Sequence, residues 1–157
     1  MKKEVKAANV TVGVGLDILW HALSKDLKVM LPKLMPNLVK DAKVIEGDGG
    51  LGSIFLFTFG SEVEAITYQK EKVTDLDESL HRIGLQVIEG GFLEVRKFSH
   101  YKTIFQLTAA IGEQETAVDV TVEYESQAED DAIPTKTLSA SLHFIKCLEN
   151  HLLNGTS

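Results

Sequence analysis

Hydrophobic and polar residues alternate along most of the chain, and this pattern predicts a protein made largely of β-strands. An opening strand starts near Val5 and ends near Gly13. Six further strand-like segments follow, at residues 38–46, 53–60, 64–75, 80–88, 95–108 and 116–125. Because short turns rich in Gly, Asp and Glu separate these six segments, we expect neighbouring strands to pair antiparallel.

Three segments change from alternation to a helical period. Residues 16–24 place leucines and Trp20 at helical spacing, which predicts a first short helix. A second short helix follows a cap at Ser24 or Asp26 and ends at Pro36. Residues 129–153 carry one apolar stripe at spacings of three and four, which predicts a long helix with its regular part starting close to Pro134.

This order of elements predicts a single α+β domain over residues 1–157. A curved antiparallel sheet of seven strands would wrap around the long C-terminal helix, and the two short helices would close one end. A strongly curved sheet that packs on only one helix cannot fill its concave side with side chains. We therefore expect an internal cavity.

Composition and charge narrow the classes of partner. The chain has 16 basic and 23 acidic residues, a net charge of −7, which argues against a nucleic-acid or anionic-membrane surface. No apolar run approaches the length of a membrane span, and the N-terminus lacks a signal-type apolar stretch. Cys147 is the only cysteine, which favours a reducing compartment. We expect a cytoplasmic protein that can enter the nucleus by diffusion.

Residues 47–52 fit the dinucleotide-binding pattern GxGxxG, but their surroundings argue against that function. A true fingerprint leaves a strand and opens a helix whose N-terminal amides hold the pyrophosphate. Here the glycines lead into residues 53–59, an alternating aromatic and β-branched segment that reads as a strand. A tight connection between two strands, with glycine at positive φ, is the better interpretation. The five histidines are scattered without metal-ligand spacing, so neither a cofactor nor a metal is expected.

Several motifs together resemble the birch-pollen-allergen, or class-10 pathogenesis-related, family of plant defence proteins. The resemblance covers the whole chain and rests on residues 33–36, 46–52 and 87–91. Residues 68–71, 83–91, 134–137 and 152–155 are similar to the cytokinin-specific, phytohormone-binding branch. The resemblance implies a helix-grip fold, with a seven-stranded sheet around a long helix, two short helices in a V and a large internal cavity.

On the segment 64–75, strand periodicity puts Gln69 and Glu71 on one face and Tyr68, Lys70 and Lys72 on the other. Two lysines mark the solvent face, so Gln69 and Glu71 should point inward. Burying these polar groups is costly unless they find partners. Internal waters or a helix hydroxyl would satisfy them in a purely structural role. In the hormone-binding branch, the matching glutamine and glutamate hydrogen-bond an adenine-type ligand.

The resemblance also implies ligand contacts from the last helix, where the branch uses a threonine and a tyrosine. The matching positions are Ser141, which keeps the hydroxyl, and Phe144, which lacks the phenolic donor. The apolar lining is expected to comprise Leu23 and Leu27 of the short helices, Phe55, Phe57 and Phe59 on one strand, and Ile83, Leu85 and Val87 on another. For any one of these, ordinary core packing is an equal explanation.

Two enzymatic functions known in this family are the alternatives to hormone binding. Norcoclaurine synthase, a condensing enzyme of the same family, uses a glutamate, a lysine and an aspartate around a tyrosine. By position only the glutamate is kept, as Glu71, while the tyrosine corresponds to Gln69, the lysine to Ile83 and the aspartate to Lys102. Ribonuclease activity, attributed to some relatives, depends on a lysine that corresponds here to Phe55, and the acidic chain is a poor host for RNA.

The sequence therefore predicts a binding protein without catalytic activity. Its expected partner is a small plant hormone, most readily a cytokinin such as trans-zeatin, with a gibberellin or another hydrophobic metabolite as the alternative. A condensing enzyme of the norcoclaurine-synthase type is the alternative from another class. No nucleic-acid or membrane partner is expected.

Overall fold

The computed structural model describes residues 3–63, 66–95, 97–111, 114–126 and 132–155. Its elements follow the predicted order, with one short helix added. They are β1 (Glu4–Val12), α1 (Leu16–Ser24), α2 (Leu27–Leu34), β2 (Val39–Glu46), β3 (Ile54–Phe59), β4 (Tyr68–Asp77), β5 (Arg82–Gly90), α3 (Gly91–Glu94), β6 (Phe98–Ala109), β7 (Thr116–Ser126) and α4 (Ala132–Asn154).

The strands form one seven-stranded sheet in the order β1-β7-β6-β5-β4-β3-β2. Every neighbouring pair is antiparallel, and β1 closes the sheet by pairing with the last strand, β7. Register shifts in the β2–β3, β4–β5 and β6–β7 pairs are the irregularities at which strands bend and twist more strongly. The predicted α+β fold is confirmed.

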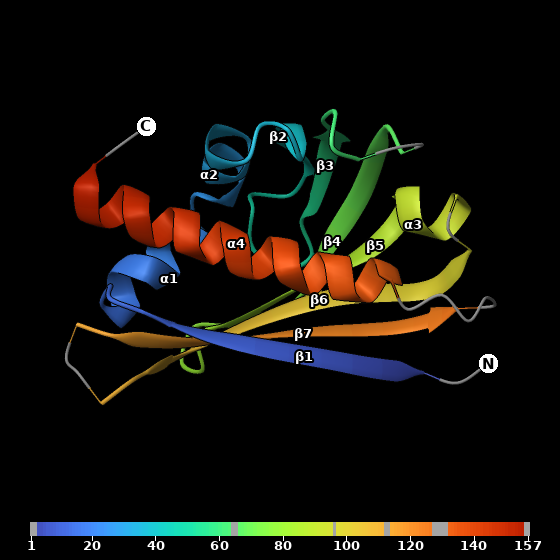
Figure 1. The fold of residues 1–157 in the computed structure, drawn as a ribbon. Coiled ribbons are helices and arrows are strands. Elements are labelled where there is room, and N and C mark those ends of the chain that lie inside the picture. The colour runs from blue at the N-terminus through green and yellow to red at the C-terminus, as the bar shows by residue number, and fades with distance from the viewer. Residues whose placement is uncertain (1–2, 64–65, 96, 112–113, 127–131, 156–157) are drawn as a thin grey trace.

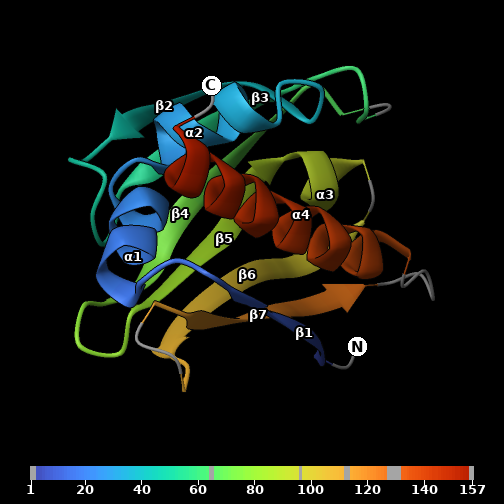
Figure 2. The same ribbon diagram turned by 60° about the vertical axis from the view of Figure 1, so that its left-hand side comes forward.

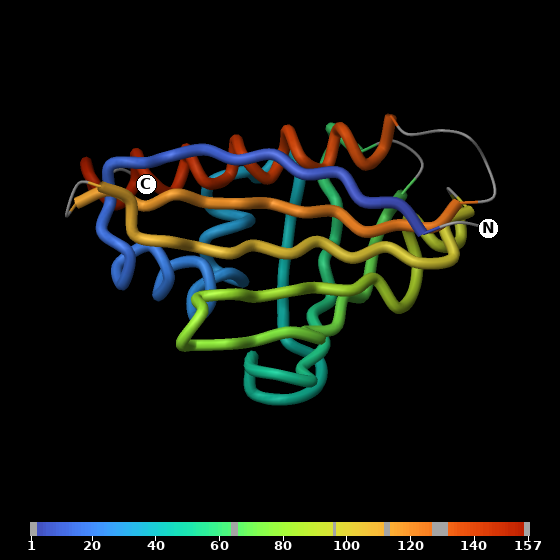
Figure 3. The backbone as a smooth tube through the Cα atoms, turned by 90° about the horizontal axis from the view of Figure 1, so that it is seen from below, coloured from blue at the N-terminus to red at the C-terminus, as the bar shows by residue number. Residues whose placement is uncertain are grey.

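The sheet curves around α4, which crosses its concave side (Figure 1). Seen from below, β1, β7 and β6 run side by side along the length of α4, whereas β2 and β3 run across that direction (Figure 3). The core lies between these layers. It includes Leu138, Ile145 and Leu148 from the predicted helical stripe, all of them buried. The remaining stripe residues Leu142 and Leu152 pack against this core while partly exposed.

The two short helices close one end of the sheet, as Figure 2 shows for α1 beside the β4–β5 turn. Trp20 of α1 donates its indole N–H to Glu78 in that turn at 2.6 Å. The Trp20 ring also makes an edge contact with His81, with 5.5 Å between ring centroids. Lys25 adds an ion pair with Glu78 at 3.2 Å. These contacts fix α1 to the sheet and seal this end of the concave side.

The glycine-rich loop between β2 and β3 is a strand connection, as predicted. Gly47, Gly49 and Gly52 have φ of 89°, 101° and 84°, values that side-chain-bearing residues rarely adopt. The Gly49 amide donates to Ser53 Oγ at 2.9 Å, and the Gly50 amide donates to Asp48 Oδ1 at 2.9 Å. The Gly52 amide donates to the carbonyl oxygen of Val73 in β4 at 2.9 Å. Because these three amides already have partners and the loop opens no helix, it does not offer a phosphate cradle.

Several boundaries differ from those predicted. Residues 91–94 form α3 instead of a turn, and the sixth strand starts at Phe98 and not at 95. The fourth strand starts at Tyr68, and residues 64–65 of its predicted range lie outside the described residues. Residues 129–131 of the predicted long helix lie outside them as well. No helix in the described part of the chain has the length and apolar character needed to cross a membrane.

Candidate functional site

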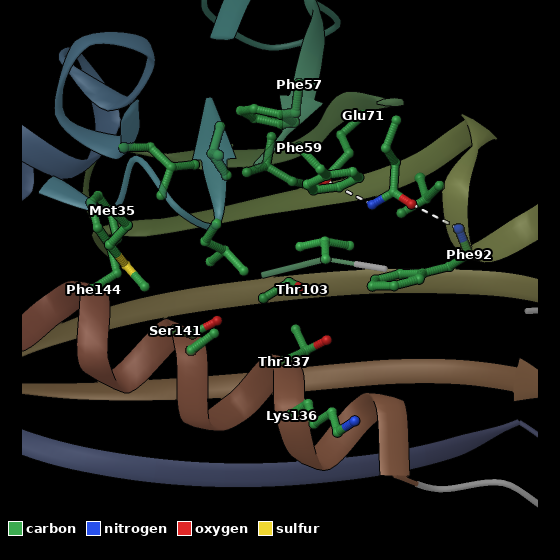
Figure 4. Close-up of a pocket in the computed structure, with 18 of the residues that line it drawn as sticks. Met35, Phe57, Phe59, Glu71, Phe92, Thr103, Lys136, Thr137, Ser141 and Phe144 are labelled. Atoms are coloured by element: carbon green, nitrogen blue, oxygen red, sulfur yellow. Dashed lines mark hydrogen bonds between the residues drawn. The ribbon is translucent and has the colours of Figure 1, made fainter. Parts of the chain in front are cut away.

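A cavity of about 510 Å³ lies between the concave face of the sheet and the helices α2, α3 and α4 (Figure 4). This volume is in the range of small-molecule binding sites. Its wall is mostly apolar, with side chains from α2, β3, β5, α3 and α4. Two exposed charged residues, Glu62 before β4 and Lys136 at the start of α4, also line it and mark its opening.

Of the predicted ligand-contacting residues, nine line this cavity: Leu27, Phe57, Phe59, Gln69, Glu71, Leu85, Val87, Ser141 and Phe144. Leu23, Phe55 and Ile83 do not line it, although all three are buried in the core. Leu23 is on α1 and Ile83 is at the start of β5, so both lie toward the end that α1 closes. Phe55 instead stacks on Phe57, with 5.7 Å between ring centroids. For these three, core packing is the role that the structure gives them.

Gln69 and Glu71 lie inside the cavity, as strand periodicity predicts. Gln69 is 2% exposed. Its Nε2 donates to Glu71 Oε2 at 3.1 Å, and its Oε1 accepts from the backbone N–H of Phe92 at 2.9 Å (Figure 4). Gln69 thus joins β4 to α3 and orients the carboxyl group of Glu71. Among the described residues, one amide N–H of Gln69 and further lone pairs on Glu71 have no partner and are available for a ligand.

The Gly90–Gly91 pair explains why the glutamine amide fits against the backbone. A Cβ atom on Gly91 would collide with Gln69 Oε1, and one on Gly90 would meet the carbonyl oxygen of Tyr68 at 2.8 Å. Both glycines have positive φ, 81° and 39°. Their close approach lets the Phe92 amide reach Gln69. The two glycines that end the 87–91 motif therefore support the polar pair in the cavity.

Burial raises the pKa of Glu71 from its ordinary value of 4.5 to about 7. The hydrogen bond from Gln69 lowers the pKa, but this effect is smaller than that of burial. The carboxyl group therefore changes charge near neutral pH. Neutral Glu71 can donate a proton or a hydrogen bond, and ionised Glu71 accepts strong hydrogen bonds from N–H groups. A titrating carboxyl in a largely apolar cavity is a typical feature of functional sites.

Sequence reasoning missed five polar residues of the cavity: Glu62, Tyr101, Thr103, Lys136 and Thr137. Tyr101 and Thr103 belong to the inward face of β6, which Phe105 continues. The strand period would have revealed them once the register of β6 was known. Thr137 and Ser141 are four residues apart and share one face of α4 (Figure 4).

The described residues include no group of three or more His, Cys, Asp or Glu side chains that could hold a metal ion. The polar groups inside the cavity are the Glu71 carboxyl, the Gln69 amide and hydroxyls, and a second carboxyl, from Glu62, and the ammonium group of Lys136 lie near the opening. This donor set suits hydrogen bonding to an organic molecule, with most of its surface in apolar contact.

A curved antiparallel sheet that grips a long helix around such a cavity defines the class of helix-grip proteins that bind small hydrophobic molecules. The chain belongs to the pathogenesis-related protein Bet v 1 family, whose profile matches residues 4–155. The family resemblance noted in the sequence is confirmed.

Three similar proteins illustrate the range of this family. The carrot (Daucus carota subsp. sativus) isoallergen Dau c 1.0401 is 32% identical over 91 residues, 55% of this chain and 58% of its own length. The chain therefore spans less than two thirds of that relative. Norbelladine synthase of Narcissus pseudonarcissus is 29% identical over 122 residues, 77% of this chain and 74% of the enzyme. A Thalictrum flavum norcoclaurine synthase point mutant, solved with a transition-state analogue, has a TM-score of 0.78 at 26% identity, covering 98% of each chain.

These comparisons correct the prediction of a protein without catalytic activity. Two named enzymes are similar to most of this chain, so membership of the family does not separate binding proteins from enzymes. The prediction relied on the missing lysine and aspartate of the condensing enzymes. It gave too little weight to Glu71, whose pKa of about 7 suits proton transfer.

Proposed function

We propose that the cavity binds an adenine-type plant hormone, a cytokinin such as trans-zeatin, with Glu71 as the main polar contact. The observation that carries this proposal is a carboxyl group with spare acceptor capacity, held by Gln69 against an apolar wall. An adenine ring offers N–H groups at its edge and a flat apolar face. The N–H groups complement the carboxylate, and the face complements the phenylalanine and leucine side chains.

The ligand's N–H groups favour the ionised form of Glu71, so the affinity should depend on pH. If only the carboxylate binds, a pKa of about 7 makes the affinity about tenfold higher at pH 8 than at pH 6. Gibberellic acid, the alternative ligand, is itself an anion in this range. It would be repelled by ionised Glu71, and its affinity should fall over the same interval.

Calorimetric titration with trans-zeatin and with gibberellic acid at both pH values tests the proposal. Glu71→Gln should remove the pH dependence. Glu89→Gln is the matched control, because Glu89 is on the outer face beside Lys70, at 3.1 Å. Absence of heat with trans-zeatin, together with failure to displace a fluorescent probe from the cavity, would rule out the cytokinin ligand.

A second candidate is a condensing enzyme that joins an amine to an aldehyde. The specific observation in its favour is again Glu71, which at a pKa of about 7 can protonate the departing oxygen as water leaves the addition product. The other positions used by norcoclaurine synthase are not reactive here. Ile83 is a core residue, and Lys102 pairs with Asp75 at 2.9 Å on the outer face.

Incubation with dopamine and 4-hydroxybenzaldehyde, followed by mass spectrometry, distinguishes the two candidates. A product that forms faster than in buffer, and that is lost in Glu71→Gln but kept in Glu89→Gln, supports the enzyme. Tight binding of trans-zeatin without such turnover supports the hormone-binding function.

A further inference from the structure

The cavity contains a second polar group that the proposed function does not use. Tyr101 of β6 and Thr137 of α4 both line the cavity, 36 residues apart in sequence. The Tyr101 Oη and Thr137 Oγ1 atoms are 2.5 Å apart and share a hydrogen bond. The pair connects the sheet wall of the cavity with its helix wall.

The phenol of Tyr101 is held in place by its neighbours. The residue is 1% exposed. Its ring packs against Phe92 and Phe98, with centroid separations of 4.6 and 4.9 Å. Burial also raises the pKa of the phenol, so it keeps its proton at neutral pH. Tyr101 is thus a fixed, neutral hydroxyl.

The Tyr101–Thr137 pair has one hydroxyl hydrogen that the bond between the two residues does not use. Two hydroxyl groups carry two hydrogens, and the bond between them uses only one. Within the described part of the chain, this is the only hydrogen bond that either hydroxyl makes. One hydroxyl hydrogen therefore remains for an acceptor inside the cavity. Glu71, in contrast, supplies an acceptor, so the cavity presents both kinds of group.

We infer that the Tyr101–Thr137 pair selects ligands that carry an oxygen acceptor, such as a hydroxyl, carbonyl or ether group, in addition to the N–H groups that face Glu71. This inference rests on the proposed function in using the same cavity, and it narrows the ligand class. Among adenine-type molecules it favours those with a hydroxyl in the side chain over their hydrocarbon counterparts. The pair also supplies the phenolic donor that Phe144 lacks.

trans-Zeatin and isopentenyladenine test this inference because they differ by one hydroxyl group. We expect the wild-type protein to bind trans-zeatin about three- to tenfold more tightly, the usual effect of one hydrogen bond. Each single substitution leaves one hydroxyl whose hydrogen becomes free for the ligand. The double variant Tyr101→Phe/Thr137→Val removes both hydroxyl groups. It should bind trans-zeatin and isopentenyladenine equally well.

Tyr68→Phe is the matched control, because the Tyr68 hydroxyl donates to Glu89 on the outer face at 3.1 Å. It should keep the wild-type preference. Thermal unfolding checks that the double variant is folded. If the double variant is unfolded, the two affinities of the wild-type protein still test the inference. Equal affinity for trans-zeatin and isopentenyladenine overturns it.

A ligand pair without a purine separates this inference from the proposed function. 2-Naphthol and naphthalene also differ by one hydroxyl, and both can be assayed by displacement of 1-anilinonaphthalene-8-sulfonate. If neither purine binds, but the double variant loses a wild-type preference for 2-naphthol, the cytokinin proposal fails and the inference holds. If the double variant keeps the wild-type preference in either ligand pair, the inference is wrong. Failure of all four molecules to bind contradicts both.

Discussion

The carboxyl of Glu71, which lines the cavity, should make the stability of the protein depend on pH in an unusual direction. The perturbation is Glu71→Gln, which removes the titrating group while keeping its shape and its ability to accept from Gln69. The pKa is 4.5 in the unfolded chain and about 7 in the folded protein. The folded state binds the proton of Glu71 more tightly than the unfolded chain does. The stabilisation that Glu71 contributes is therefore complete below pH 4.5 and is lost as the pH rises through about 7.

The size of the effect follows from the pKa difference. At about 1.4 kcal/mol for each pH unit, the wild-type protein should lose about 2–3 kcal/mol more stability than Glu71→Gln between about pH 5 and pH 8. An acidic group whose pKa is lowered in the folded protein has the opposite effect, because it makes the stability rise with pH. Glu89 is an example, because the hydrogen bond from Lys70 lowers its pKa.

Urea unfolding of both proteins at the two pH values measures the effect, because all other titrating groups cancel in the comparison. Glu89→Gln serves as the control and should keep the wild-type loss, since a group with a lowered pKa titrates below this interval. Equal losses of stability in the wild-type protein and Glu71→Gln would show that the pKa of Glu71 is not raised in the folded protein. The carboxyl would then be hydrated, and the pH dependence proposed for ligand binding would lose its basis.

Three further predictions concern the backbone beside Gln69, the α4 wall of the cavity and the attachment of α1. Gly91→Ala should lower the free energy of unfolding by about 1–3 kcal/mol, because its Cβ would displace the glutamine amide at a positive φ. Gly13→Ala, whose Cβ meets only ordinary contacts, should change stability much less in the same urea titration. Phe144→Tyr should strengthen trans-zeatin binding in calorimetry by about 1 kcal/mol by adding a phenolic donor to the cavity. An unchanged or weaker affinity would show that the ligand lies away from α4. Glu78→Ala removes the acceptor of the Trp20 indole N–H and should lower the melting temperature by several degrees, about 1–2 kcal/mol. An unchanged melting temperature would mean that α1 does not need this contact.

Local patterns accounted for most of the fold. Alternation and turn residues located all seven strands, and short connections implied their antiparallel pairing. The same two-residue period placed Gln69 and Glu71 inside, because the lysines of β4 had to face solvent. The four-residue helix α3 was missed, since a single turn is too short to show a helical period.

The composition of the cavity wall was harder to predict. Alternation tells which face of a strand a residue occupies, but not its height along the sheet. Ile83, toward the end that α1 closes, and Phe55, which stacks on Phe57, therefore face the interior without lining the cavity. The tyrosine at position 101 has nothing in its own sequence neighbourhood to pair it with Thr137.

The elements, their order and the inward direction of the two polar residues on β4 follow from the sequence, because they depend on neighbours within a few positions. Which side chains come into contact depends on how the elements pack. The contact of Tyr101 with Thr137, the support of Gln69 by the Phe92 amide and the raised pKa of Glu71 all depend on segments far apart in the chain. Burial and distance are properties of the packed fold, and the chemistry of the cavity follows from them.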